Sequence, residues 1–233
     1  MRAESLSAWP QVRGLGLHDT TGTGQPAAMG QLDGQSAIVA GGATGPGSRI
    51  ATALAEAGAR VLIADPDADA AERMARRLGG LALGTDFTRE TEVAALAYHV
   101  SDSLEEADIL VNAVPCPAPA RPSPADFDRL TALALRPLCL VLHHLVPAMA
   151  ERGSGLVLNV APVLASPIWG AAVSAWTGAA TRALAAELEP AGLRVNALVP
   201  GSGPAADPGP SALALCVRPD ATDVILDYRP KAD

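Results

Sequence analysis

The stretch from Gln35 to Asp65 constrains the fold of this chain more than any other part of the sequence. It opens with a short apolar run, Ala37 to Val39, which is followed by Gly41. Apolar residues then recur at helical spacing, and a second apolar run, Val61 to Ala64, ends at Asp65. The pattern predicts a strand, a glycine turn, a helix and a second strand, which together form one βαβ unit of a nucleotide-binding sheet.

The turn has the glycine spacing G-x-x-x-G-x-G, formed by Gly41, Gly45 and Gly47. Gly41 lets the chain leave the strand sharply, and the other two let the backbone and the new helix come close to a pyrophosphate. The amino end of the helix presents free N–H groups and a positive dipole end to that anion. Pro46 has no N–H to donate, so we expect dinucleotide binding to be weakened by about 1–2 kcal/mol or lost.

Asp65 follows the turn by about 20 residues, the spacing at which a carboxylate accepts hydrogen bonds from the ribose hydroxyls of a dinucleotide. A carboxylate at this position repels a 2′-phosphate. The sequence therefore predicts NAD as the cofactor rather than NADP.

The rest of the chain alternates between helical and strand patterns, which predicts an α/β fold: a Rossmann-type doubly wound parallel sheet with helices on both faces. Four further helices are expected within 66–80, 90–104, 125–149 and 166–188, the third of them bent near Pro137. Strands are expected at 81–84, 109–114, 156–160, 193–199 and 224–228. The prolines between residues 201 and 220 leave little room for a helical substrate lid.

Length and composition indicate one domain, with a flexible N-terminal extension over residues 1–31 and the folded domain over 32–233. The formal net charge is -8 with no basic cluster, which argues against nucleic acid as a partner. We find no apolar run that predicts a membrane span. Three widely separated cysteines fit a reduced cytoplasmic protein better than a disulfide framework, and the Ala-, Gly- and Arg-rich composition suggests a bacterial source.

No metal site is predicted. His143 and His144 share a helix with Cys139, but adjacent histidines point to different faces of a helix, and no carboxylate is placed to help. A packing or interface role is therefore the favoured interpretation.

Several motifs occur in an order that resembles the short-chain dehydrogenase/reductase family in its small single-domain form, from Leu32 to about Gly201. Thr85-Asp86 is similar to the aspartate motif that meets the adenine, and the stretch from Asp108 to Asn112 is similar to the fourth strand and the start of the family's asparagine motif. The resemblance implies a homodimer, or a heteromer with an intact family member, through a four-helix contact. Small residues on one of those helices would permit close packing: Gly178, Ala179 and Ala183. It also implies that the cofactor-binding residues are Gly41, Gly45, Pro46, Gly47, Asp65, Asp86 and Asn112.

The family's catalytic residues are a serine, a tyrosine, a lysine four residues later, and an asparagine. This chain has one lysine, Lys231, and two tyrosines, Tyr98 and Tyr228, and neither tyrosine has a lysine four residues later. By resemblance, the asparagine position falls on Ala134, the serine position on Ala161 or Pro162, the tyrosine position on Gly170 or Val173, and the lysine position on Ser174 or Thr177.

Three functions remain open at this stage. The first expectation is a non-catalytic or auxiliary NAD(H)-binding subunit. The second is a non-redox enzyme on the same scaffold, such as a cyclase, dehydratase or isomerase, in which Ser174, Trp176 and Thr177 form a different polar site. The third is an atypical NAD-dependent oxidoreductase.

Overall fold

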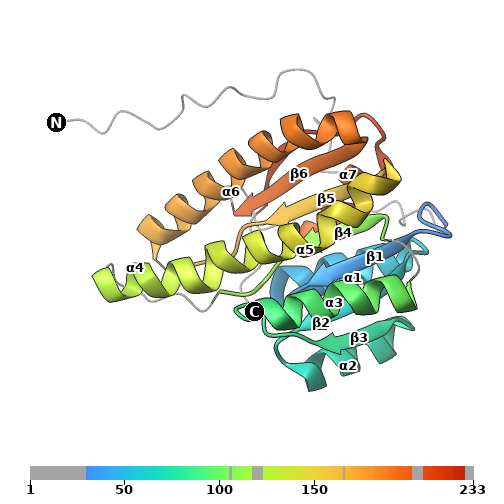
Figure 1. The fold of residues 1–233 in the computed structure, drawn as a ribbon, viewed down its shortest axis with the longest axis horizontal. Coiled ribbons are helices and arrows are strands. Elements are labelled where there is room, and N and C mark those ends of the chain that lie inside the picture. The colour runs from blue at the N-terminus through green and yellow to red at the C-terminus, as the bar shows by residue number, and fades with distance from the viewer. Residues whose placement is uncertain (1–29, 105–106, 117–122, 165, 201–206, 229–233) are drawn as a thin grey trace.

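A seven-stranded parallel sheet forms the centre of the molecule, in the order β3-β2-β1-β4-β5-β6-β7 (Figure 1). The computed structural model describes residues 30–104, 107–116, 123–164, 166–200 and 207–228. The predicted doubly wound, Rossmann-type α/β fold is confirmed. The strands are β1 (Ser36–Ala40), β2 (Arg60–Asp65), β3 (Leu81–Gly84), β4 (Ile109–Asn112), β5 (Gly155–Val160), β6 (Leu193–Pro200) and β7 (Ile225–Tyr228).

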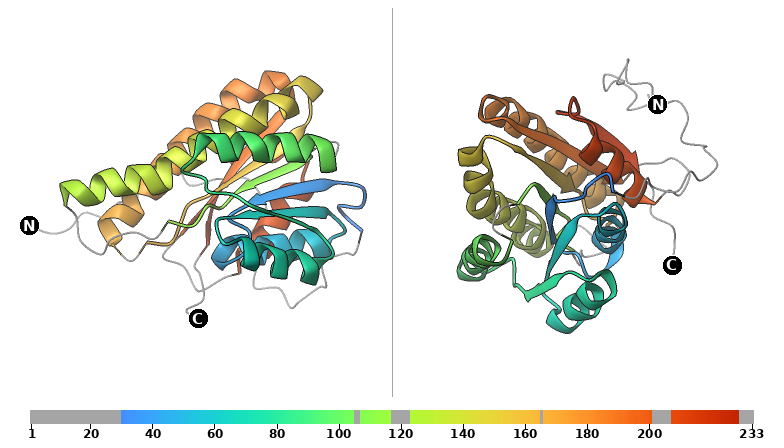
Figure 2. Two further views of the ribbon diagram at one scale, coloured as in Figure 1. Left: turned by 60° about the horizontal axis from the view of Figure 1, so that its bottom comes forward. Right: turned by 90° about the vertical axis from the view of Figure 1, so that its right-hand side faces the viewer.

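Two helical layers enclose the sheet, as the end-on view in Figure 2 shows. One layer contains α1 (Gly45–Glu56), α2 (Ala68–Leu78) and α7 (Pro208–Val217), whose apolar side chains form one core with the sheet. The other contains α3 (Glu90–Ser103), α5 (Arg136–Arg152) and α6 (Pro167–Leu188), which form a second core. The central strands are almost fully buried, as expected for a parallel sheet that is covered on both faces.

The long helix expected over residues 125–149 has three parts: α4 (Pro124–Leu130), a π-helical turn η1 (Thr131–Leu135), and α5. The turn ends two residues before Pro137, which cannot donate a backbone hydrogen bond to the preceding turn. A single wider turn at this point fits the predicted irregularity near Pro137.

Apolar side chains on α5 pack against the sheet, including Val141, Leu145 and Met149. The continuous helical segment Ala125–Arg152 has 28 residues, and its most apolar 18-residue window has a mean hydropathy of 1.5, so by length and composition alone it could cross a membrane. Inspection of the sequence for apolar runs did not anticipate this. The packing against the sheet is that of a core helix, however, and 39% of its most apolar window is buried inside the fold.

The helix α7 corrects the expectation that prolines would exclude a helix between residues 201 and 220. Asp207 caps its amino end by accepting a hydrogen bond from the N–H of Gly209 at 2.9 Å. Pro208 and Pro210 both fall in the first turn, where backbone N–H groups have no partner within the helix. The prolines are therefore compatible with the start of this helix. The earlier part of the expected lid, residues 201–206, lies outside the described residues.

A partly buried hydrogen-bond network joins the carboxyl end of α7 to the sheet. The guanidinium of Arg194, on β6, donates hydrogen bonds to the carbonyl oxygens of Leu215 at 2.9 Å and Arg218 at 2.6 Å. The side-chain oxygen of Asn196 accepts a hydrogen bond from the N–H of Val224 at 2.9 Å. These contacts fix the connection between α7 and β7, so that β7 can pair with β6.

The predicted domain boundary between residues 31 and 32 stays a prediction. The first 29 residues of the expected extension lie outside the described residues. Leu32 is 1% exposed and belongs to the core on the α1 side, so the packed fold includes it.

Candidate functional site

The glycine turn joins β1 to α1 at the carboxyl edge of the sheet. Gly41 has a φ of +79°, a conformation that glycine adopts at little cost, and its N–H donates to the carbonyl oxygen of Ala64 on β2 at 2.7 Å. Gly47 lies so close to the turn that a Cβ added there would be 2.0 Å from the carbonyl oxygen of Gly41. Gly45 is the first residue of α1 and Pro46 the second. The amino end of α1 is therefore held directly against the turn.

Asp65 lies beside this turn although it is 22 residues away from Ala43 in sequence. Its Oδ2 accepts a hydrogen bond from the N–H of Ala43 at 3.0 Å, and its Oδ1 accepts one from the N–H of Asp67 at 3.1 Å. The residue is 4% exposed. The fold thus brings together the glycine turn and the carboxylate that the sequence assigns to pyrophosphate and ribose.

Two more predicted cofactor residues lie at the same edge of the sheet. Asp86 follows β3, and hydrogen bonds from the hydroxyl and the N–H of Thr88 lower the pKa of its carboxyl group. Asn112 ends β4, where it is 2% exposed and its amide donates to the carbonyl oxygen of Leu138 at 3.4 Å. Thr85 is 1% exposed, and its hydroxyl has no hydrogen-bond partner within the described ranges.

These features fit the adenosine and pyrophosphate half of a dinucleotide. The turn leaves the start of α1 close to β1, a carboxylate flanks the turn, and the buried hydroxyl of Thr85 lacks a partner among the described residues. Seven residues at this edge carry the expected cofactor contacts, and the structure places all of them in described segments. Their individual roles stay predictions.

Two of the catalytic positions expected from the family resemblance lie in one apolar cluster. Ala134 on η1 and Val173 on α6 belong to one small cluster with Cys116 and Leu130. Burial raises the pKa of the Cys116 thiol, which keeps it protonated at neutral pH. The remaining members of this cluster are Leu133, Leu164 and Trp169. No side chain at the asparagine position or at either candidate tyrosine position can ionise.

The two tyrosines do not replace the missing phenol. Tyr98 lies on α3 with 73% of its surface exposed. Tyr228 ends β7 and is 2% exposed; its hydroxyl donates to the carbonyl oxygen of Ala161 at 3.2 Å. Burial raises the pKa of Tyr228, so its phenol is a weaker acid than in water. Tyr228 therefore has a packing role beside the expected serine position, a contact that the sequence did not signal.

The helix α6 presents one buried row of residues four apart toward the sheet: Val173, Thr177 and Thr181. The hydroxyl of Thr181 accepts a hydrogen bond from the amide of Asn159 on β5 at 3.1 Å. Gly170 and Ser174, the other pair of positions left open by the sequence, are only partly buried. The two possible alignments of the tyrosine and lysine positions therefore place them on different faces of α6. Val173 and Thr177 lie on the buried face, and Gly170 and Ser174 lie on a partly exposed one.

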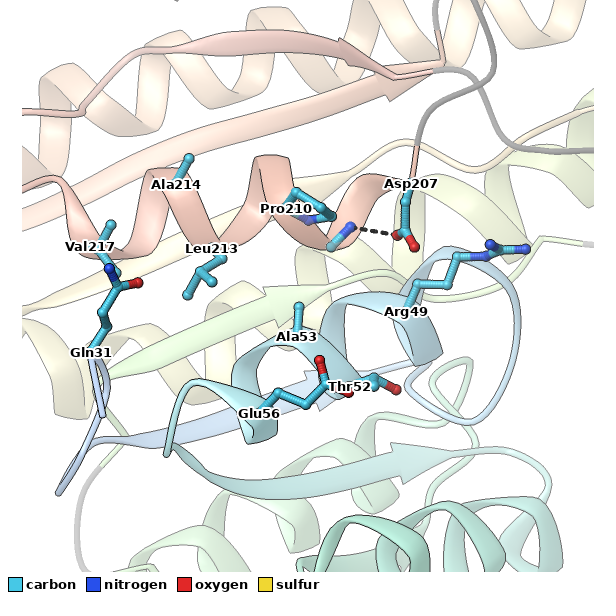
Figure 3. A pocket seen from close by; sticks show the side chains of 11 residues that line it. Gln31, Arg49, Thr52, Ala53, Glu56, Asp207, Pro210, Leu213, Ala214 and Val217 are labelled. Carbon is cyan, nitrogen blue, oxygen red and sulfur yellow. Dashed lines mark hydrogen bonds between the residues drawn. The ribbon is translucent and has the colours of Figure 1, made fainter. Parts of the chain in front are cut away.

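A separate cavity of about 670 Å³ lies between α1 and α7, on the face of the sheet opposite to α6 (Figure 3). Arg49 and Asp207 lie near one end of it, and Gln31 and Val217 near the other. The described residues that line it include none of the expected cofactor or catalytic positions. We therefore do not assign it to the dinucleotide.

The histidines considered for a metal have one carboxylate nearby, which corrects the expectation that no carboxylate is placed to help. His144 lies 3.8 Å from the carboxylate of Glu90 on α3, and its ring packs against that of His143 with the ring centroids 4.8 Å apart. Among the described residues, no group of three or more His, Cys, Asp or Glu side chains could hold a metal ion.

Comparison with known proteins identifies the family. Residues 35–204 match the family model described as short chain dehydrogenase, so the chain belongs to that family. It is 33% identical over 184 residues to 7alpha-hydroxysteroid dehydrogenase from Escherichia coli (strain K12), a match that covers 74% of this chain and 72% of the relative. It is also 33% identical over 186 residues to D-threitol dehydrogenase from Mycolicibacterium smegmatis, covering 73% of this chain and 70% of the relative.

Solved structures agree with the fold and with the class of cofactor. The crystal structure of 3-ketoacyl-(acyl-carrier-protein) reductase from Brucella melitensis, complexed with NADH, has a TM-score of 0.73 and 30% sequence identity. The match covers 84% of this chain and 97% of that one. The family assignment supports a nicotinamide dinucleotide as the cofactor.

These relatives overturn one expectation from the sequence. We expected a non-catalytic or auxiliary subunit because the catalytic positions lack their usual residues. The similar proteins are named dehydrogenases and a reductase, and these comparisons support an oxidoreductase. The expectation of a non-catalytic subunit was wrong because it took the absence of one set of acid–base residues as evidence that no oxidoreductase activity remains.

Proposed function

We propose that this protein is an atypical NAD(H)-dependent oxidoreductase that interconverts an alcohol and a carbonyl compound. The observation that carries the proposal is the buried carboxylate of Asp65 against the glycine turn, 3.0 Å from the N–H of Ala43. This geometry supports dinucleotide binding, and the similarity to named dehydrogenases supports the class of reaction.

The residues at the carboxyl edge of the sheet would hold the cofactor as follows. The turn from Gly41 to Gly47 would cradle the pyrophosphate, Asp65 would accept hydrogen bonds from the adenosine ribose, and Asp86 would meet the adenine. A carboxylate beside the ribose disfavours a 2′-phosphate, which supports NAD over NADP. When bound, the cofactor would supply or accept the hydride.

The chain must handle the proton of the substrate oxygen without the family's phenol and ammonium groups. The expected tyrosine and lysine positions hold Gly170 or Val173 and Ser174 or Thr177, none of which titrates near neutral pH. We propose that solvent water supplies this proton and that turnover is slow for that reason. General acid–base groups typically raise the rate of the chemical step by about 10²- to 10⁴-fold. We expect turnover by this chain to be slower by a factor in that range.

Asp65→Asn is expected to weaken NAD binding by about 10- to 100-fold, because the neutral amide loses charge-assisted hydrogen bonds to the ribose. Calorimetric titration with NAD and NADH, alongside NADPH, measures the change. Asp69→Asn, an exposed position on α2, is the matched control and should leave binding unchanged. Equal loss in both variants would show that the overall charge matters and that Asp65 has no contact with the ribose. No NAD binding by the parent protein at millimolar ligand would reject the proposed function.

Pro46→Ile is expected to tighten NAD binding by about 5- to 30-fold, since it restores one backbone N–H to the turn, a gain of about 1–2 kcal/mol. Pro46→Ala restores the same N–H without the larger side chain and should behave alike. A gain with isoleucine only would indicate side-chain packing instead of the N–H. Unchanged affinity in both variants would show that this N–H does not reach the pyrophosphate.

The quaternary structure and location belong to the same proposal. We propose a cytoplasmic homodimer through α5 and α6, with no membrane or nucleic-acid partner. On α6, Ala175, Ala179 and Ala183 form an exposed row of small residues four apart, which permits close helix packing. Gly178, which we expected at this contact, instead faces β7, where a Cβ would be 3.2 Å from the side chain of Ile225.

A further inference from the structure

Two helical segments project beyond the carboxyl ends of the strands: α4 with η1, and the first turns of α6 (Figure 1). The apolar cluster described above joins them, with Leu130 and Val173 at its buried centre. Leu164 and Trp169 pack against it from the connection after β5 and the start of α6. This projecting arm thus has its own small core, which adjoins the positions where the family's reaction takes place.

The surface of this arm exposes several large apolar side chains. Phe127 on α4 is 55% exposed, Val163 after β5 is 47% exposed, and Ile168 on α6 is 62% exposed. The ring of Phe127 lies against that of Trp169, with the centroids 6.1 Å apart and the planes tilted by 46°. Three of the six large apolar side chains identified as exposed in the described residues lie on this arm or on the connection that leads into it, close to the expected catalytic positions.

A polar atom inside this apolar setting points to a ligand. The indole Nε1 of Trp169 is shielded from solvent and has no hydrogen-bond acceptor within the described segments. A buried donor without an acceptor is costly, and tryptophan N–H groups usually find a partner when they are buried. Trp169 directly precedes Gly170, one of the two expected positions of the catalytic tyrosine. An oxygen atom of a bound molecule would satisfy this donor.

We propose that the arm binds the substrate and that this substrate is an apolar ketone or secondary alcohol. Its oxygen accepts a hydrogen bond from Nε1 of Trp169, and its hydrocarbon part packs on Phe127, Val163 and Ile168. Trp169 packs against the apolar cluster of the arm, and its ring also lies against the half-exposed ring of Phe127. Because Nε1 is shielded, the ligand reaches it only when one of these neighbouring side chains moves aside. This assignment rests on the proposed oxidoreductase function and adds the substrate class to it.

Equilibrium dialysis of the full-length protein with three probes tests the assignment without requiring turnover. The probes are 4-phenylcyclohexanone, the matching hydrocarbon phenylcyclohexane, and the polar ketone dihydroxyacetone. We expect the apolar ketone to bind about 3- to 10-fold more tightly than the hydrocarbon, because only the ketone accepts the indole hydrogen bond. The polar ketone should bind more weakly than both.

Trp169→Phe keeps an aromatic ring but removes the N–H donor. It is expected to abolish the preference for ketone over hydrocarbon while hydrocarbon affinity changes by less than about 2-fold. Tyr98→Phe, which removes the hydroxyl of an exposed aromatic side chain on α3, is the matched control and should preserve the preference. Equal weakening of ketone and hydrocarbon by Trp169→Phe would overturn the oxygen contact, and tighter binding of dihydroxyacetone would overturn the apolar substrate class.

A parallel assay of NADH oxidation separates this inference from the proposed function. If 4-phenylcyclohexanone binds as expected but NADH is oxidised with none of the ketones, the substrate surface stands as a binding site and the oxidoreductase proposal fails. If NADH is oxidised with dihydroxyacetone but 4-phenylcyclohexanone neither binds nor reacts, the proposal of an apolar substrate bound to the arm is wrong, and the oxidoreductase proposal is supported.

Discussion

Replacing Val173 by Tyr and Thr177 by Lys in one chain is expected to raise NADH-dependent reduction of 4-phenylcyclohexanone by about 100-fold or more. A phenol placed near the substrate oxygen can donate the proton, and an ammonium group four residues later lowers the pKa of that phenol. The increase lies at the lower end of what general acid catalysis contributes, because the new groups enter a site that did not evolve to hold them.

The geometry of α6 favours this pair over the alternative. Val173 and Thr177 lie on the buried row that ends at Thr181, whose hydroxyl bonds to Asn159 on β5. Val173 also packs in the same cluster as Ala134, the expected asparagine position. A tyrosine at residue 173 would therefore lie next to the position from which the family's asparagine acts.

Gly170→Tyr with Ser174→Lys is the matched control, because it places the same two groups at the other possible tyrosine and lysine positions. A Cβ at Gly170 would have only ordinary contacts, the nearest 3.8 Å away at the carbonyl oxygen of Leu164, so this pair should fold at least as well. Steady-state rates of both double variants, with thermal unfolding to confirm that each is folded, decide the question. A rate increase only in the Gly170→Tyr/Ser174→Lys variant would show that the tyrosine and lysine positions are Gly170 and Ser174. No increase in either folded variant would show that the missing proton donor does not limit turnover.

The fold was predictable because the βαβ pattern recurs along the chain with its strands and turns in order. The glycine turn and Asp65 were predictable for a similar reason, since their separation in sequence is itself the signal, and the structure brings Asp65 within 3.0 Å of the N–H of Ala43. In both cases a local pattern combined with a common topology is sufficient to place the residues.

The substrate side of the site was not predictable in this way. Cys116, Leu130 and Val173 come from three different segments, and nothing in their spacing indicates that they pack together. The helix α7 was missed because prolines were interpreted as helix breakers without regard to their position in the first turn. Tyr228 was judged only as a possible catalytic phenol, whereas its burial and its bond to Ala161 depend on the pairing of β7 with β6.

Gly47→Ala is expected to lower the free energy of unfolding by about 2–3 kcal/mol and to weaken NAD binding by at least about 10-fold. The added Cβ would be 2.0 Å from the carbonyl oxygen of Gly41, a backbone atom that cannot rotate away. The amino end of α1 must therefore retreat from β1. This movement displaces the N–H groups that are expected to meet the pyrophosphate, so stability and binding should fall together.

Gly153→Ala is the control that separates this clash from the general cost of replacing a glycine. Gly153 caps α5 at the amino edge of the sheet, with a φ of +78° and nothing within 4 Å of an added Cβ. Alanine there costs about 1 kcal/mol through backbone strain alone and should not affect NAD binding. Urea unfolding and calorimetric titration of both variants provide the comparison. If Gly47→Ala lost stability but bound NAD with unchanged affinity, the close contact between the turn and α1 would support only the fold, and the dinucleotide would have to bind elsewhere.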